Sequence, residues 1–259
     1  MNKKTGFVAF LGCPNAGKST LLNACIGAKI AIVSNKPQTT RNRILGIYTK
    51  DNTQILFLDT PGIHTNHHLS SMNHLMNNTA WSVLQECDVV CYLVDVTKGL
   101  TEEDRQWICE ILKKFRKKLI LLATKSDKIK KEFVLKKISE VNDGFENLIS
   151  NLNKEEINCD LVDKKFLAIS AKNIESISFL RNHISKYLNF APWLYDEDDM
   201  TDKPEKFICS EMIREQLFRQ LGKELPYKMA VVIEHFQMKE NIIYIHASII
   251  VEKPSHKAM

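Results

Sequence analysis

Residues 12–19, GCPNAGKS, constrain this chain more than any other stretch, because they fit the spacing GxxxxGK[ST]. The segment begins where the apolar run GFVAFLG ends, and it leads into STLLNACI, whose apolar residues recur at helical spacing. A strand, a glycine-rich turn and a helix in this order surround an anion with backbone N–H groups and a helix N-terminus. The sequence therefore predicts a phosphate-binding loop, and a turn of chance composition is the weaker interpretation.

The side chains of this loop have separate predicted roles. Lys18 reaches the β and γ phosphates, and the Ser19 hydroxyl is a ligand for magnesium. The nucleotide contacts predicted from this segment are Gly12, Pro14, Asn15, Ala16, Gly17, Lys18, Ser19 and Thr20.

Short apolar runs alternate with helical patterns along the first two thirds of the chain. Each run has the length of a strand and is apolar on both faces, as in a parallel sheet covered on both sides. Between two of them, residues 101–117 open with Thr101 and Asp104 in a capping arrangement and continue with one apolar face. The runs are GFVAFLG, QILFLDT, VVCYLVDV, LILLATK and KFLAISA. This order predicts an α/β fold with a doubly wound, mostly parallel sheet, and together with the phosphate-binding loop it indicates the P-loop NTPase type.

The pattern changes after Leu188. The stretch NFAPWLYDEDDMTDKPEKF has two prolines and an acidic cluster without helical spacing, which predicts a linker on the surface. A helical pattern and two strand patterns, MAVVIEHF and IIYIHASIIV, follow it. The predicted domains are therefore an α/β domain over residues 1–188, a linker over 189–206 and a partial α+β domain over 207–259.

Composition narrows the setting of the protein. The net charge of +5 suits an anionic partner but is too small to identify one. The seven cysteines form no CxxC pair, which predicts free thiols in a reducing compartment. With no apolar run of membrane-spanning length and a polar, short start, the chain is expected to be cytoplasmic.

Four further stretches stand in the order that a nucleotide site requires. In DTPG, Asp59 is predicted to hold magnesium through water, and the Gly62 N–H to sense the γ phosphate. In PQTTR, residues 37–41, Thr40 is predicted to close over the metal. The predicted catalytic residues are Lys18, Thr40, Asp59 and Gly62, and the predicted magnesium ligands are Ser19, Thr40 and Asp59.

The other two stretches, TKSD and SAK, each end a predicted strand on the same edge of the sheet. Asp127 can accept two hydrogen bonds from the edge of guanine, which adenine cannot donate in that pattern. Lys125 would lie over the base, and Ala171 could donate its N–H to the guanine carbonyl. The predicted base-binding residues are Thr124, Lys125, Asp127, Ser170, Ala171 and Lys172.

With these motifs in place, the chain resembles a translation-factor-class GTPase, and specifically the Era family of ribosome-assembly GTPases. The resemblance extends over nearly the whole chain. It is carried by GCPNAGKSTLLN, PQTTRNRILGI, DTPGIH, TKSD and SAK, and then by SEMIREQLFRQ, KELPY and IHASIIVEKPSHK. It implies that residues 1–188 form a Ras-like G domain of the Era type. It also implies a monomeric switch that binds GTP or GDP with Mg²⁺, and that engages 16S rRNA and the 30S subunit through a C-terminal type II KH-like domain. Peripheral contact with the inner face of the cell membrane is a further expectation.

Two departures from the family pattern lead to predictions. Thr124 stands where the family has asparagine, and a hydroxyl cannot reproduce the two-sided bonding of an amide, so weaker guanine affinity is expected. The sequence ends at Met259, before the GxxG loop of a KH domain, whose backbone clamps single-stranded RNA. Either the chain is truncated or its RNA role has decayed.

Hydrolysis is expected to be slow. The position after the DxxG glycine, where Ras-like switches place a water-orienting glutamine, is Ile63. The resemblance implies that Asn15 helps to hold a potassium ion, with capping of the loop as the alternative. Three nearby histidines, His64, His67 and His68, indicate a mobile switch loop rather than a metal site.

Three functions remain open from the sequence. The first is a regulatory GTPase of ribosome assembly. The second is a phosphotransferase acting on a small metabolite, which would also use Lys18 and Ser19. The third is a nucleotide-binding interaction module with little RNA binding, because the KH-like domain is incomplete.

Overall fold

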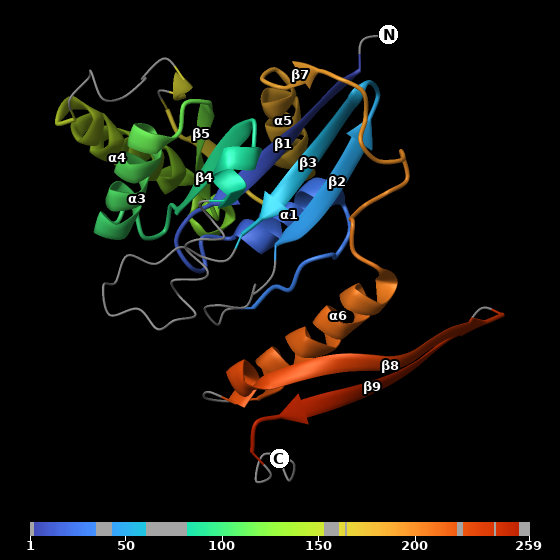
Figure 1. Cartoon of the computed structure of the whole chain (residues 1–259). Helices are drawn as coiled ribbons and strands as arrows, with labels where there is room; N and C mark the ends of the chain where they lie inside the picture. The colour runs from blue at the N-terminus through green and yellow to red at the C-terminus, as the bar shows by residue number, and fades with distance from the viewer. Residues whose placement is uncertain are drawn as a thin grey trace.

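The structure is a computed structural model that describes residues 3–34, 43–60, 82–152, 161–163, 165–221, 225–240 and 242–253. Its larger part is one seven-stranded sheet in the order β2-β3-β1-β4-β5-β6, with β7 paired to β1 (Figure 1). The strands are β1 (Lys4–Leu11), β2 (Ile44–Lys50), β3 (Thr53–Asp59), β4 (Val89–Asp95), β5 (Lys118–Thr124), β6 (Leu167–Ile169) and β7 (Asn189–Phe190).

The pairing within the sheet confirms the predicted doubly wound, mostly parallel arrangement. β1, β3, β4, β5 and β6 run parallel to one another, and they correspond to the five predicted runs. β2 pairs antiparallel with β3 through a tight turn in which Asp51 has a φ of 52°. This edge strand was not predicted, because Gly46 interrupts its short apolar pattern. A Cβ at Gly46 would lie 2.8 Å from side-chain atoms of Leu22 and Ile26, so glycine permits the close approach of the first helix.

Helices cover both faces of the sheet (Figure 1). In β1, Val8 and Phe10 join the apolar cluster under α1 and α5, whereas Ala9 and Leu11 join the cluster under α3 and α4. This alternation is the period of a strand, and it explains why the runs are apolar on both faces. The helices are α1 (Lys18–Ile26), α3 (Glu102–Lys114), α4 (Lys131–Ser150) and α5 (Ile174–Ser185), with a 3-10 turn at Ser126–Lys128.

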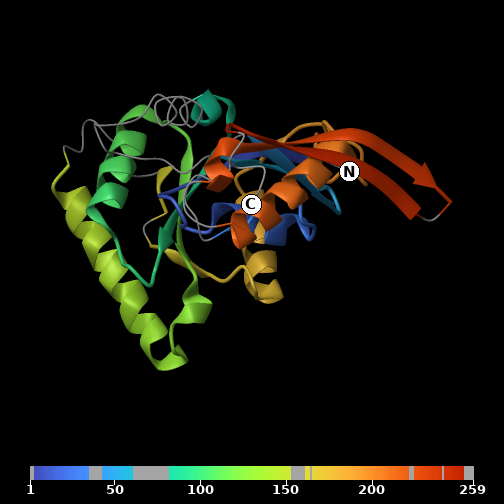
Figure 2. The ribbon, with the colours of Figure 1, turned by 90° about the horizontal axis from the view of Figure 1, so that it is seen from below.

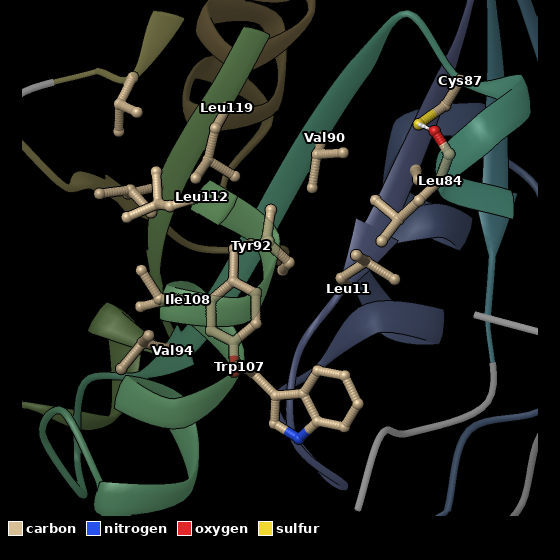
Figure 3. Close-up of a cluster of buried hydrophobic side chains, with 14 of the residues drawn as sticks. Leu11, Leu84, Cys87, Val90, Tyr92, Val94, Trp107, Ile108, Leu112 and Leu119 are labelled. Atoms are coloured by element: carbon tan, nitrogen blue, oxygen red, sulfur yellow. Dashed lines mark hydrogen bonds between the residues drawn. The ribbon is translucent and has the colours of Figure 1, made fainter. Parts of the chain in front are cut away.

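The cluster under α3 is drawn in Figure 3, where Tyr92 of β4 lies beside Ile108 of α3. The Tyr92 hydroxyl donates a hydrogen bond to Asp104 Oδ1 at 3.1 Å. Asp104 also forms the predicted capping box, because its N–H donates to Thr101 Oγ1 at 3.2 Å and its carboxylate accepts from the Thr101 N–H at 3.1 Å. The start of α3 is thereby fixed to the core.

A second, smaller unit follows. It contains α6 (Glu205–Gln220), a 3-10 turn at Leu225–Lys228 and an antiparallel ribbon of β8 (Met229–Lys239) and β9 (Ile242–Val251). These are the predicted helix and two strands. In Figures 1 and 2, α6 lies between the ribbon and the larger sheet, and the far end of the ribbon extends past the helix. The strand-rich C-terminal unit after a G domain agrees with the predicted fold class.

The segment predicted as a linker lies along the larger unit. Asn189 and Phe190 pair with β1 as β7. The buried Gln54 side chain accepts from the N–H groups of Leu194 and Tyr195, at 2.9 and 3.1 Å, and donates to the Tyr195 carbonyl at 2.9 Å. The predicted boundaries after residues 188 and 206 stay predictions.

Two other expectations, on the state of the cysteines and on membrane-spanning helices, can be compared with the described residues. The cysteines at positions 13, 25, 87, 91, 109 and 209 are all free thiols, as predicted, and Cys159 lies outside the described residues. Within the described ranges, no helix has both the length and the apolar character needed to cross a membrane.

Candidate nucleotide site

A cleft of about 480 Å³ opens at the carboxyl ends of the parallel strands. This is the edge at which open α/β sheets bind ligands. The predicted site residues that line the cleft are Pro14, Asn15, Gly17, Lys18, Ser19, Thr20, Thr124, Lys125, Asp127, Ala171 and Lys172. Segments separated by more than 150 residues in the sequence therefore meet around one cavity.

The phosphate loop has the backbone that its glycines predicted. Gly12 has a φ of 147°, and a Cβ there would lie 2.5 Å from the Leu93 carbonyl oxygen. Gly17, with a φ of 98°, is the residue before the first turn of α1. Asn15 also has a positive φ, of 63°. The loop packs tightly against β4, and this contact leaves no room for a side chain at Gly12.

Lys18 is buried beneath this loop. Its Nζ donates to the carbonyl oxygens of Gly12 and Cys13, at 2.8 and 3.0 Å. Burial lowers the pKa of Lys18, and the nearby negative charge of Asp59 opposes that shift. The ammonium group is thus held in the curl of the loop, where a phosphate would supply the missing counter-charge.

Ser19 and Asp59 come together from α1 and β3. The Ser19 hydroxyl donates to Asp59 Oδ2 at 2.6 Å, and Asp59 is buried. A hydroxyl and a carboxylate are oxygen ligands of the kind that Mg²⁺ prefers, so the donor set fits the predicted ion. Thr40 and Gly62 lie outside the described residues, as do Ile63 and the three histidines of the predicted switch loop.

Thr124, at the end of β5, ties neighbouring segments together. Its hydroxyl lies 2.7 Å from the Ala16 carbonyl oxygen of the phosphate loop and 3.1 Å from the Val94 carbonyl oxygen of β4. A single hydroxyl proton is shared between these two acceptors. Threonine therefore keeps a link between the base-side loop and the phosphate loop, and its expected effect on guanine affinity stays a prediction.

The carboxylate of Asp127 is oriented by the SAK segment. Asp127 Oδ1 accepts from the Ser170 hydroxyl at 3.0 Å, and Oδ2 lies 3.0 Å from Lys172 Nζ. Desolvation by itself would raise the pKa of Asp127, but hydrogen bonds from Lys172 and Ser170 outweigh it and hold this pKa below its usual value. Asp127 is therefore ionised at neutral pH and acts only as an acceptor, as a guanine edge requires.

Sequence reasoning missed several residues that line the cleft. Ile32, Val33 and Ser34 form one side, in the segment after α1. Asp95 ends β4 and Thr97 follows this strand, and the Asp95 carboxylate lies 2.6 Å from Lys125 Nζ. The position of Asp95 at the carboxyl end of a predicted parallel strand was the available signal.

A phosphate loop alone is shared by many nucleotide-binding proteins. Here it faces an ionised aspartate on the base side, held by the loop after β6, and this combination in a Ras-like sheet defines the class of P-loop GTPases. A family model described as 50S ribosome-binding GTPase matches residues 7–125.

Relatives over nearly the full length define the family more narrowly. GTPase Era from Syntrophus aciditrophicus (strain SB) is 39% identical over 258 residues, which are 99% of this chain and 78% of the relative. GTPase Era from Pseudomonas aeruginosa (strain LESB58) is 37% identical over 254 residues, 98% of this chain and 77% of the relative. The chain belongs to the Era family of GTPases, and it is a GTP-hydrolysing enzyme that binds guanine nucleotides.

Solved structures agree with this assignment. Era in complex with MgGDPNP and nucleotides 1506–1542 of 16S ribosomal RNA is similar with a TM-score of 0.80 and 33% identity, covering 98% of this chain and 80% of that one. A variant of Aquifex aeolicus Era bound to GDP and AlF4⁻ gives a TM-score of 0.80 and 32% identity, covering 97% and 80%. The relatives therefore identify the chain as a GTPase and not as a phosphotransferase acting on a small metabolite.

Proposed function

We propose that this GTPase is a nucleotide-controlled switch that acts in small ribosomal subunit assembly by binding 16S rRNA and the 30S subunit. The observation that carries the proposal is the extent of the similarity. The matching Era structure that holds 16S rRNA covers 98% of this chain, including the C-terminal unit. A chain that shared only the G domain would match over its first part alone.

The nucleotide contacts follow from the cleft. The phosphates lie on the loop from Gly12 to Thr20, and the base lies between TKSD and SAK. The proposed contacts are Gly12, Pro14, Asn15, Ala16, Gly17, Lys18, Ser19, Thr20, Asp59, Gly62, Thr124, Lys125, Asp127, Ser170, Ala171 and Lys172. Two contacts support this assignment of a phosphate side and a base side. Lys18 is buried beneath the loop, and Asp127 is held by Ser170 and Lys172.

Catalysis in this site is mainly electrostatic. Ser19, Asp59 and Thr40 would hold Mg²⁺, which would neutralise phosphate charge when bound. The Lys18 ammonium stabilises the same phosphates, and the Gly62 N–H donates to the γ phosphate. Because Ile63 cannot orient water, intrinsic hydrolysis is slow, and Asn15 would help to hold a potassium ion, which would supply a further positive charge. A positive φ at Asn15 and its place in the lining of the cleft support that assignment.

The C-terminal unit is the part that meets RNA. Its helix and ribbon form the first part of a type II KH-like domain, and the protein acts as a monomer in the cytoplasm with peripheral contact at the inner face of the cell membrane. The alternative is a nucleotide-binding interaction module with little RNA binding. The exposed apolar side chains of the ribbon, such as Tyr244 and Ile245, favour a protein partner under that alternative.

Nucleotide specificity tests the first half of the proposal. Titration of GTP, ATP and xanthosine triphosphate against the wild type and Asp127→Asn, with Mg²⁺ present, is expected to show a preference for GTP that moves to the xanthosine nucleotide in the variant. Asp143→Asn, on the exposed side of α4, is the matched control and keeps the wild-type preference. A wild type that binds ATP and GTP equally contradicts the base-reading role of Asp127.

Cosedimentation with 30S subunits tests the second half. The GTP-loaded protein is expected to pellet with subunits more than the GDP-loaded protein, and an RNA carrying the 3′ end of 16S rRNA is expected to compete. If GTP binding is normal but neither the GTP-loaded nor the GDP-loaded protein binds subunits or RNA, the proposed switch in subunit assembly is wrong. The interaction-module alternative then replaces it.

A further inference from the structure

Asp95 is a nucleotide-site residue that none of the sequence motifs includes. It ends β4, lines the cleft and is only 8% exposed. Its Oδ2 lies 2.6 Å from the Nζ of Lys125, the lysine of TKSD. The pair joins the carboxyl ends of the neighbouring strands β4 and β5, and both residues line the cleft.

The carboxylate is fixed before any ligand arrives. Asp95 Oδ1 accepts hydrogen bonds from the Thr97 N–H at 3.1 Å and from the Thr97 hydroxyl at 2.6 Å. The turn that carries Thr97 is itself bonded to β5, because the Val96 N–H donates to the Thr124 carbonyl oxygen at 3.1 Å. One oxygen is therefore occupied within the turn, and the other is left to face Lys125.

The charge state of the carboxylate agrees with this arrangement. Desolvation by itself would raise the pKa of Asp95, but hydrogen bonds from Lys125 and Thr97 outweigh it and leave the pKa below its usual value. Asp95 is ionised at neutral pH, so it holds the ammonium group by a charge-assisted hydrogen bond.

The backbone and stem of Lys125 are also constrained. Lys125 has a φ of 61° and precedes the 3-10 turn that carries Asp127. Its Cε would lie 4.0 Å from a Cβ built on Gly17, so the stem runs beside the phosphate loop between β5 and β4. A lysine stem that is anchored at both ends offers a flat apolar surface, whereas a free lysine samples many rotamers.

We infer that Asp95 is a positioning residue for guanine nucleotide binding, which holds the Lys125 stem as a preformed wall of the base pocket. The inference rests on the proposed role of Lys125 beside the base. Because the wall is ordered before the ligand binds, the nucleotide does not have to order it, and affinity rises accordingly. Asp95 acts through Lys125, so its effect should be confined to ligands that carry a base.

A double-mutant cycle tests this inference. Asp95→Asn keeps the shape of the side chain and its bonds to Thr97. It replaces the carboxylate oxygen that faces the Lys125 ammonium group with an uncharged amide NH₂ group, which cannot accept a hydrogen bond from it. We expect it to weaken GDP and GTP binding by about tenfold in the wild-type background and less than twofold in the Lys125→Met background. Inorganic triphosphate, which has no base, should bind wild type and Asp95→Asn equally.

Two results would overturn the inference. One is an equal loss of GDP affinity in both backgrounds, which means that Asp95 acts independently of Lys125. The other is a parallel loss of triphosphate affinity, which means that the variant disturbs the phosphate loop. If Asp95→Asn does not fold, Thr97→Val releases the Asp95 carboxylate by a milder change and should give a smaller loss with the same dependence on Lys125.

The test also separates this inference from the proposed function. If Asp127→Asn moves the preference to xanthosine nucleotides but the cycle is additive, the base site stands and only the role of Asp95 fails. If neither Asp127→Asn nor Lys125→Met changes GDP affinity, the proposed base site itself is wrong.

Discussion

The Glu215 carboxylate of α6 lies 3.0 Å from the Nζ of Lys29, in the segment that follows α1. Glu215 is fully buried, pairs also with Arg219, and accepts a hydrogen bond from the Val33 N–H at 3.4 Å. Val33 in turn lines the nucleotide cleft. A buried carboxylate of the C-terminal unit therefore joins this unit to one wall of the cleft.

Replacing Glu215 with glutamine should weaken the contact between the C-terminal unit and the segment after α1. Glu215→Gln keeps the shape but leaves Lys29 and Arg219 without their buried counter-charge. We expect the free energy of unfolding to fall by about 1–3 kcal/mol, below the full cost of a broken buried ion pair because Lys29 is partly exposed. Urea unfolding measures the change. Limited proteolysis should also cut the segment around residues 191–204 faster in the variant.

Glu146→Gln, on the exposed side of α4, is the control and should stay within about 0.5 kcal/mol of the wild type. Equal stability of Glu215→Gln and Glu146→Gln would show that the buried carboxylate does not hold the two units together.

Gly12→Ala should disable the phosphate loop. The added Cβ combines an unfavourable φ of 147° with a contact of 2.5 Å to the Leu93 carbonyl oxygen. We expect the free energy of unfolding to fall by about 3 kcal/mol or more and GTP binding to be lost. Thermal melting and nucleotide titration measure the two effects.

Gly99→Ala is the control that introduces backbone strain without a steric clash. Gly99 also has a positive φ, of 75°, but nothing lies within 4 Å of its added Cβ. This variant should lose about 1–2 kcal/mol of stability and still bind GTP. If both alanine variants bind GTP normally, the close approach at Gly12 does not shape the site.

Nucleotide binding should take up protons at alkaline pH. Burial lowers the pKa of Lys18 in the free protein, so its neutral form becomes populated at a lower pH than that of an ordinary lysine. Bound phosphate favours the charged form and raises this pKa, so protons are absorbed on binding. Calorimetric titration of GDP in two buffers with different ionisation enthalpies measures the uptake. The uptake should be larger at alkaline pH than at neutral pH, and equal proton release in both pH ranges would contradict the prediction.

The buried cysteines should be inert in the native protein. Burial raises the pKa of Cys25 and of Cys87 to about 12, so their thiols stay protonated at neutral pH. The partly exposed Cys209, on α6, should react with a thiol reagent before either of these two buried cysteines. Mass spectrometry of protein alkylated before and after unfolding in urea checks the order. Early modification of Cys25 in the folded protein would show that α1 opens more readily than its packing implies.

The sequence by itself determined the phosphate loop, the parallel sheet and the base-side motif. Each of these is encoded locally. The GxxxxGKS spacing forces a tight curl before a helix, and the apolar residues on both faces of β1 require cover on both sides. Asp127 and Ser170 could be placed together from the sequence because carboxyl ends of parallel strands share one edge.

Only the tertiary structure decided which side chains hold these motifs in place. Asp95 and Lys125 are 30 residues apart, and Lys29 and Glu215 are 186 apart. No local pattern marks either pairing: Lys125 belongs to TKSD and Asp95 ends a predicted strand, but neither position indicates its partner. Their contact depends on how neighbouring strands and a distant helix pack, because an ion pair forms only where packing brings the two groups within a few ångströms and removes water from around them.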